Sequence, residues 1–327
     1  METNKQSSYW IGSVRIGGQA YPRFMGGPLD GFTDAPFRQL VRQFSPQALL
    51  YTEMRHVSCV AHDAGGKKSL NFLQQERPLQ YQITASSLVD IERAVARILA
   101  VGVDGIDLNI ACPARNVVKS RSGSAVMADM PLLKEILTVL RDLVKLPLTV
   151  KMRAGFKEKN ALDVVRLVTD CGVDALAIHP RLQTEGFAGT PDWDLVAAVK
   201  KTTPIPVLYS GGIIDFASAQ AVYERTGVDG FLIGRGMQGA PWKLAALQAA
   251  ARGEPYIVSS QTICAVALEH LALMCHYYGD DGLYNFRKFI PFYVKDGDGA
   301  SALRQRLMVC ESVAGVREGL RAFLKEV

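Results

Sequence analysis

Residues 105–113 read GIDLNIACP, a short run rich in apolar residues that ends in Asn109, Cys112 and Pro113. Such a run predicts a buried strand that places a thiol in the loop after it. Seven further runs of this kind occur, and longer amphipathic stretches separate them. The eight predicted strands are residues 24–29, 48–53, 79–84, 105–110, 148–153, 175–180, 206–211 and 230–234.

This alternation predicts βα units around a parallel sheet. Eight strands are the number that a (β/α)8 TIM barrel requires, although an open doubly wound sheet gives the same alternation. The informative residues lie at the carboxyl ends of most of these strands, which favours the barrel, because a barrel gathers its active site there. Residues 90–100 and 129–144 are predicted helices between strands.

The alternation stops at Gly253, Glu254 and Pro255. Beyond this point, residues 262–278 and 300–323 have the apolar spacing of long helices. The predicted organisation is therefore an N-terminal extension (1–22), a barrel (23–250) and a small C-terminal all-helical domain (256–327).

Composition excludes several classes of protein. Hydrophobic residues make up 48% of the 327 residues, which excludes a disordered or fibrous chain, and the net charge of +5 permits a polyanionic partner. The six cysteines show no spacing typical of a metal site, so we expect reduced thiols, a cytoplasmic location and no metal. The chain has no signal-peptide pattern and no apolar run long enough to cross a membrane.

The predicted strand ends carry side chains suited to an anionic heteroaromatic ligand. Gln82 can both donate and accept at the edge of such a ring. Lys151 stands in an apolar strand, where burial costs several kcal/mol unless a negative partner is present. His179 and Arg181 follow the sixth strand and can donate to a phosphate or a carbonyl.

The last two strands end in glycine pairs, Ser210-Gly-Gly212 and Gly234-Arg-Gly236. Barrels build phosphate sites from backbone N–H groups in these two loops, so the pairs predict a phosphorylated cofactor. The loop after Cys112 carries Arg115, Lys119 and Arg121 without an acidic residue, which is typical of an exposed loop that meets an anion.

Five stretches resemble the flavin-dependent tRNA-dihydrouridine synthases. They are residues 28–38 (PLDGFTDAPFR), 107–113 (DLNIACP), 150–155 (VKMRAG), 179–181 (HPR) and 233–236 with 239–242 (IGRG and GAPW). They follow one another in the family's order, and the size of the chain with residues 282–285 and Arg287 is similar to the bacterial subgroup C. The resemblance implies an FMN-containing barrel that reduces a uridine of tRNA to dihydrouridine, with NADPH as the electron donor. It also implies that tRNA is the partner and that the helical domain (256–327) binds it.

The resemblance also assigns roles by position. Cys112 matches the family's catalytic acid. The matches to flavin-contacting positions are Pro28, Leu29, Asp30, Gln82, Lys151 and His179, and those to the phosphate cradle are Ser210, Gly211, Gly212, Gly234 and Arg235. The residues expected to bind the substrate are Asn109, Arg115, Lys119, Arg121, Arg181, Arg287 and Lys288.

Three other functions fit parts of the pattern. A flavin barrel similar to dihydroorotate dehydrogenase would act on a free pyrimidine, and the basic loop favours RNA over it. A barrel without redox chemistry could use the glycine loops for a phosphorylated substrate. An RNA-binding module could keep the fold without turnover.

Overall fold

The computed structural model describes residues 8–66, 69–295 and 297–326. Eight parallel strands form a closed ring, because β4 pairs with both β3 and β6 and β11 pairs with β3. The strands are β3 (Phe24–Gly26), β4 (Leu50–Tyr51), β6 (Leu79–Thr84), β7 (Gly105–Ile110), β8 (Leu148–Gly155), β9 (Ala175–Leu182), β10 (Val207–Ser210) and β11 (Gly230–Ile233). The ring confirms the predicted (β/α)8 barrel, and a short strand β5 (Arg55–His56) adds to β6.

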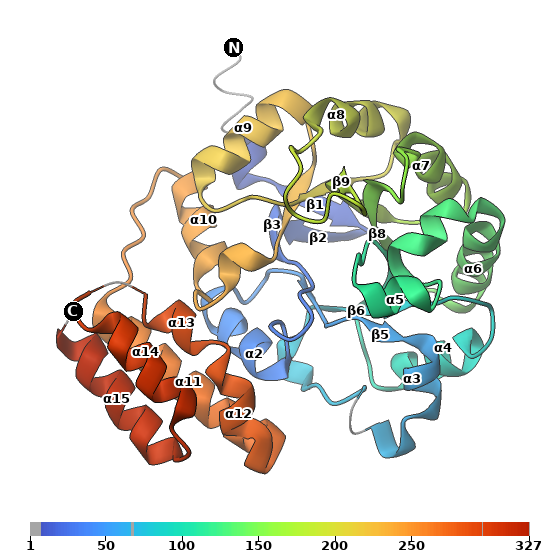
Figure 1. Cartoon of the computed structure of the whole chain (residues 1–327). Helices are drawn as coiled ribbons and strands as arrows, with labels where there is room; N and C mark the ends of the chain where they lie inside the picture. Colours follow the sequence, from blue (N-terminus) through green and yellow to red (C-terminus); the bar gives the residue numbers. More distant parts are fainter. Residues whose placement is uncertain (1–7, 67–68, 296, 327) are drawn as a thin grey trace.

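Helices surround the ring in sequence order (Figure 1). They are α2 (Ala35–Phe44), α3 (Val57–His62), α4 (Ile91–Ala100), α5 (Arg115–Lys119), α6 (Met130–Leu143), α7 (Ala161–Asp170), α8 (Trp193–Thr202), α9 (Phe216–Thr226) and α10 (Lys243–Ala251). Helices α2, α6, α8 and α9 each begin after an aspartate whose side chain accepts a hydrogen bond from a backbone N–H of the first turn. Such caps fix where each helix starts.

A hairpin closes the amino end of the barrel. Strands β1 (Ser13–Ile16) and β2 (Gln19–Pro22) lie within the predicted N-terminal extension, whose residues 1–7 are outside the described residues. Val14, Ile16 and Tyr21 of the hairpin are buried in one cluster with Met25 and Tyr51 from the barrel strands. The carboxyl end of the barrel is left for a ligand.

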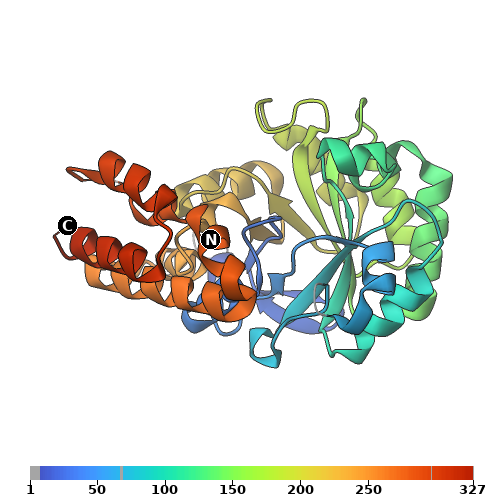
Figure 2. The same cartoon turned by 60° about the horizontal axis from the view of Figure 1, so that its bottom comes forward.

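The C-terminal part is a bundle of helices, as predicted, and lies beside the barrel (Figure 2). It comprises α11 (Ser260–Tyr278), α12 (Gly282–Arg287), α13 (Ile290–Tyr293), α14 (Ala300–Val309) and α15 (Val313–Glu326). The prediction of one helix over residues 300–323 is wrong. The chain breaks after Val309, where the Ser312 hydroxyl accepts a hydrogen bond from the Gly315 N–H at 3.0 Å and starts a new helix.

Aromatic packing joins the bundle to the barrel. The Phe289 ring lies 5.4 Å from the Phe32 ring and 5.9 Å from the Phe37 ring, measured between centroids. The Tyr278 hydroxyl donates to the Asp34 carboxylate at 3.2 Å. Since Phe32 belongs to the loop after β3, the bundle contacts the rim of the barrel's carboxyl end.

Candidate active site

A cavity of about 430 Å³ opens at the carboxyl ends of the barrel strands. The residues predicted to bind the cofactor all line it. They are Pro28, Leu29, Asp30, Gln82, Lys151, His179, Ser210, Gly211, Gly212, Gly234 and Arg235, and Asn109 and Cys112 line it as well. Among the residues that were not predicted, Met54, Arg153 and Phe187 also line it. The strand-end residues therefore converge on one site.

Hydrogen bonds hold the Cys112 loop against the cavity. The Asn109 side-chain oxygen accepts from the backbone N–H groups of Ala111 and Cys112, each at 2.9 Å. The Ser124 hydroxyl donates to the Cys112 carbonyl at 2.8 Å. Burial raises the pKa of the Cys112 thiol, although Lys151 opposes this effect. The thiol is therefore protonated at neutral pH and can serve as a proton donor.

Gly123 permits this loop to fold closely. Its φ is +58°, and a Cβ at this position would lie 2.7 Å from Val117 Cγ1 and 3.0 Å from the Cys112 carbonyl oxygen. We expect Gly123→Ala to displace the thiol, to reduce turnover and to destabilise the protein by about 1–3 kcal/mol. Urea unfolding and steady-state rates measure both effects.

Gly227→Ala is the matched control for this substitution. Gly227 also has a positive φ, of +66°, but nothing lies within 4 Å of its added Cβ. The control should therefore lose stability without losing turnover. Equal turnover in the two variants would show that the loop does not need the close approach.

Two cations extend from β8 toward the cavity. Lys151 and Arg153 lie two residues apart in the strand and so face the same side. Burial lowers the pKa of Lys151 to about 8, and the neighbouring Arg153 adds to this shift. Arg153 donates to the carbonyls of Ala111 at 2.7 Å and Leu182 at 3.0 Å. Sequence reasoning missed Arg153, although its spacing from Lys151 pointed to it.

Histidine and arginine at the end of β9 keep polar atoms without protein partners. Among the described residues, neither His179 Nδ1 nor Arg181 Nη1 has a hydrogen-bond partner, and both atoms are buried. Burial and the surrounding cations lower the pKa of His179 to about 2, so the ring is neutral and carries one N–H donor. Gly211 has a φ of +142°, and a Cβ there would lie 3.1 Å from His179 Cδ2. The loop after β10 thus passes directly beside this imidazole.

Phe187, in the loop after β9, was not predicted from the sequence. The ring is half exposed, with a relative accessibility of 52%, and it lies edge-on to His179 with a centroid separation of 5.9 Å. The Arg235 guanidinium lies 4.5 Å from the ring centroid and that of Arg153 lies 5.6 Å from it. These contacts hold the aromatic ring at the wall of the cavity.

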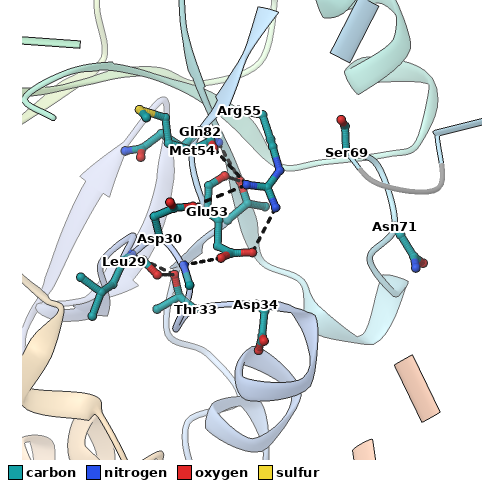
Figure 3. Close-up of polar contacts among 12 residues, drawn as sticks. Leu29, Asp30, Thr33, Asp34, Glu53, Met54, Arg55, Ser69, Asn71 and Gln82 are labelled. Carbon is teal, nitrogen blue, oxygen red and sulfur yellow. Dashed lines mark hydrogen bonds and ion pairs between the residues drawn. The ribbon is translucent and has the colours of Figure 1, made fainter. Parts of the chain in front are cut away.

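The loop after β3 is tied to the neighbouring strands (Figure 3). The Gly31 N–H donates to the Glu53 carboxylate at 2.6 Å, and Arg55 bridges Glu53 at 3.2 Å and Asp30 at 3.5 Å. Burial raises the pKa of Asp30, and the Glu53 charge adds to this effect. This network fixes the rim that carries Pro28, Leu29 and Asp30.

The basic residues predicted to bind the substrate lie in different places. Arg115, Lys119 and Arg121 are exposed on and after α5, and none forms an ion pair with another described residue. Lys288 lies over the rings of Phe32 and Phe289, at 5.8 and 5.3 Å from their centroids, beside the rim.

Arg287 takes a different direction from Lys288. It donates to the Cys310 carbonyl at 3.0 Å, which ties α12 to the break between α14 and α15. The structure therefore does not bring Arg287 to the cavity.

Within the described parts of the chain, no helix is both long and apolar enough to cross a bilayer.

Known proteins resemble both the sequence and the fold. The dihydrouridine synthase family matches residues 25–327. A probable tRNA-dihydrouridine synthase 1 from Synechocystis sp. is 30% identical over 96% of this chain and 90% of its own length. A tRNA-dihydrouridine synthase B from Pseudomonas putida is 32% identical over 91% of this chain and 90% of its own length.

Among solved structures, morphinone reductase superposes with a TM-score of 0.58 at 12% identity, over 78% of this chain and 92% of its own length. This likeness supports the barrel fold alone. The resemblance to subgroup C stays a prediction. The match over residues 25–327, together with relatives of about one-third identity along nearly the whole chain, places this chain in the dihydrouridine synthase family.

Proposed function

We propose that this protein reduces specific uridines of tRNA to 5,6-dihydrouridine, with FMN as cofactor and NADPH as reductant. One observation carries the proposal: a protonated thiol, Cys112, lines the same cavity as the cations Lys151 and Arg153. A proton donor beside a cationic surface suits a reaction that adds a hydride and then a proton to a pyrimidine ring. Because tRNA is the substrate, we also propose a cytoplasmic location.

The residues around the cavity fit an anionic flavin. His179 lines the cavity, and its buried Nδ1 has no hydrogen-bond partner among the described residues, so this atom is available to a ligand. Arg181 Nη1 likewise has no partner among them, but Arg181 does not line the cavity. The backbone at Gly211 and Gly212 has positive φ, and no side chain there blocks a phosphate. We assign Ser210–Gly212 together with Gly234 and Arg235 to the phosphate, and Gln82, Lys151 and His179 to the ring.

Each side chain then has a defined task. Reduced FMN held by Gln82, Lys151 and His179 would supply a hydride for C6 of the uracil ring. Cys112 donates its thiol proton to C5, which completes the reduction of the double bond, and the thiol regains a proton from water. Lys151 stabilises negative charge at the ring system through its ammonium group. Asn109 holds the Cys112 loop in place, as its two hydrogen bonds to the backbone indicate.

A uridine in folded tRNA reaches this cavity only after it leaves its stack. The exposed Arg115, Lys119 and Arg121 border the Cys112 loop, and Lys288 stands across the rim. We propose that these cations hold the phosphate backbone around the everted nucleotide.

The test uses purified protein, NADPH and tRNA that lacks dihydrouridine. We expect flavin absorbance in the preparation or after addition of FMN, and dihydrouridine in the tRNA by mass spectrometry. A preparation that cannot bind FMN would contradict the proposal and favour a barrel without redox chemistry. Reduction of free uridine as fast as of tRNA would favour a small-molecule substrate instead.

The double variant Lys119→Ala with Arg121→Ala tests the contact with RNA. Two lost phosphate contacts should weaken tRNA binding and reduce the slope of log K against log salt by about 1.5. Filter binding at several salt concentrations measures both. The control removes two exposed cations, Arg93 and Lys134, on the outer helices α4 and α6. Equal slopes in both double variants would show that the loop after Cys112 does not contact tRNA.

A further inference from the structure

Below the cavity, three neighbouring strands carry polar side chains inside the barrel. The register pairs Gln82 of β6 with Asp107 of β7, and Asp107 with Thr149 of β8. All three side chains are almost fully buried. A carboxylate in this position is costly unless hydrogen bonds satisfy it. Asp107 accepts from Gln82 Nε2 at 2.7 Å and from Thr149 Oγ1 at 2.5 Å.

These contacts form part of a chain that ends at the loop of the proton donor. Gln82 Oε1 accepts from Asn109 Nδ2 at 2.9 Å. Asn109 Oδ1 in turn accepts from the backbone N–H groups of Ala111 and Cys112. The hydrogen bonds therefore run without interruption from Asp107 to the Cys112 loop.

The direction of donation is fixed along this series of hydrogen bonds from the Cys112 loop to Asp107. Backbone N–H groups can only donate, so the Asn109 atom that faces them is its oxygen and its nitrogen faces Gln82. The Gln82 atom that meets this nitrogen must then be oxygen, which turns the Gln82 nitrogen toward Asp107. The group that meets the Gln82 nitrogen must be an acceptor. Asp107 Oδ2 is an acceptor whether or not the other carboxyl oxygen carries a proton.

This polarity determines what the cavity offers a ligand. Each amide nitrogen has a second N–H that no other described residue accepts, and Gln82 and Asn109 both line the cavity. The Gln82 oxygen accepts one hydrogen bond and keeps a second lone pair, so Gln82 can still both donate and accept at the cavity. The two remaining N–H groups suit a ligand edge that carries acceptors, such as carbonyl oxygens or unprotonated ring nitrogens.

We infer that Asp107 is a positioning residue that orients the Gln82 and Asn109 amides and, through Asn109, the Cys112 loop. The effect of Asp107 on catalysis rests on the proposed function, whereas its effect on the Cys112 loop does not. The acceptor oxygen of Asp107, and not its charge, does the positioning. Replacing it by a group without an acceptor leaves the buried Gln82 Nε2 without this partner, which loosens the Gln82 and Asn109 amides and, through them, the loop.

The test compares Asp107→Leu, Asp107→Asn and the control Thr149→Val. Asparagine keeps an oxygen for Gln82, and the control removes the other hydrogen bond to the same carboxylate. Two quantities are measured: FMN affinity by fluorescence quenching, and the rate at which iodoacetamide alkylates Cys112, resolved by peptide mass spectrometry over a range of pH. The alkylation measurement needs no flavin.

We expect Asp107→Leu to weaken FMN binding at least about tenfold and to accelerate Cys112 alkylation, because a directed hydrogen bond is lost and its partner is left unsatisfied. Asp107→Asn and Thr149→Val should stay within about threefold of the wild type in both measurements. If Asp107→Leu does not fold, Gln82→Met removes the middle link and should accelerate alkylation in the same way.

Two results would overturn the inference. If folded Asp107→Leu has the alkylation rate and the FMN affinity of the wild type, Asp107 does not position the two amides or the Cys112 loop. If Asp107→Asn is as impaired as Asp107→Leu, the negative charge of Asp107 is required, and not its acceptor oxygen. If the wild type itself binds no FMN, the proposed function fails, yet the alkylation rates still decide the role of Asp107.

Discussion

Cys112→Ala is expected to reduce dihydrouridine formation by about two to four orders of magnitude, the usual contribution of a positioned general acid. FMN and tRNA binding should remain, because alanine leaves the Asn109 contacts to the backbone intact. Burial keeps the thiol protonated, so no other protonation event is needed before transfer. Single-turnover assays with reduced enzyme measure the loss directly.

Cys171→Ala is the matched control for this variant. Cys171 caps the end of α7, on the outside of the barrel, and is also half-buried. Its replacement should leave the rate unchanged. If Cys112→Ala retained wild-type turnover, the thiol would not be the proton donor, and another group near the cavity would have to fill that role.

Lys151→Met is expected to have opposite effects on stability and on cofactor binding. In the flavin-free protein, the lysine is charged at neutral pH in an environment that lowers its pKa to about 8. Replacing it should stabilise the flavin-free protein by up to about 3 kcal/mol. The same change removes the buried cation for an anionic ligand, so FMN affinity should fall by about 10- to 100-fold.

The lowered pKa of Lys151 also predicts how the free energy of unfolding changes with pH. Between about pH 8 and the usual lysine pKa of 10.5, the unfolded chain binds more protons at this position than the folded protein does. The free energy of unfolding contributed by Lys151 therefore rises with pH across this window, and the penalty is complete below it. Urea unfolding of flavin-free wild type should show this rise, which Lys151→Met should lack.

Lys134→Met controls for the loss of one positive charge. Lys134 is exposed on α6, so its replacement should change neither stability nor FMN affinity. A Lys151→Met variant less stable than the wild type would mean that the lysine is well solvated or paired in the flavin-free protein.

The ring of strands could be predicted because its signals are local. Buried parallel strands are short apolar runs, and the helices between them begin at caps such as Asp129 and Asp215 that lie next to them in the sequence. Once eight strands are assigned, the topology places their carboxyl ends together. The topology therefore agrees with the family resemblance, which assigned residues as distant as Pro28 and Arg235 to one cofactor site.

Several features depended on contacts that no local pattern records. The break in the helix predicted for residues 300–323 is an exception, because its cap, Ser312, lies only three residues before Gly315 and is masked by the apolar spacing around it. Arg287 and Lys288 are adjacent in the sequence but contact different parts of the protein. Arg287 donates to the Cys310 carbonyl, whereas Lys288 lies over the ring of Phe32. A helix sends adjacent side chains about 100° apart, so packing decides which of the two reaches the rim.

The sequence by itself determined the barrel, the helical tail and the set of residues at the strand ends. Tertiary structure alone decided how these residues are paired: that Gln82 donates to Asp107 and accepts from Asn109, that Arg153 and Phe187 line the cavity, and that Asn109 holds the Cys112 loop. The physical reason is that backbone conformation follows from the periodicity of neighbouring residues, whereas the polarity of a buried amide follows from partners that only the closed barrel brings into contact.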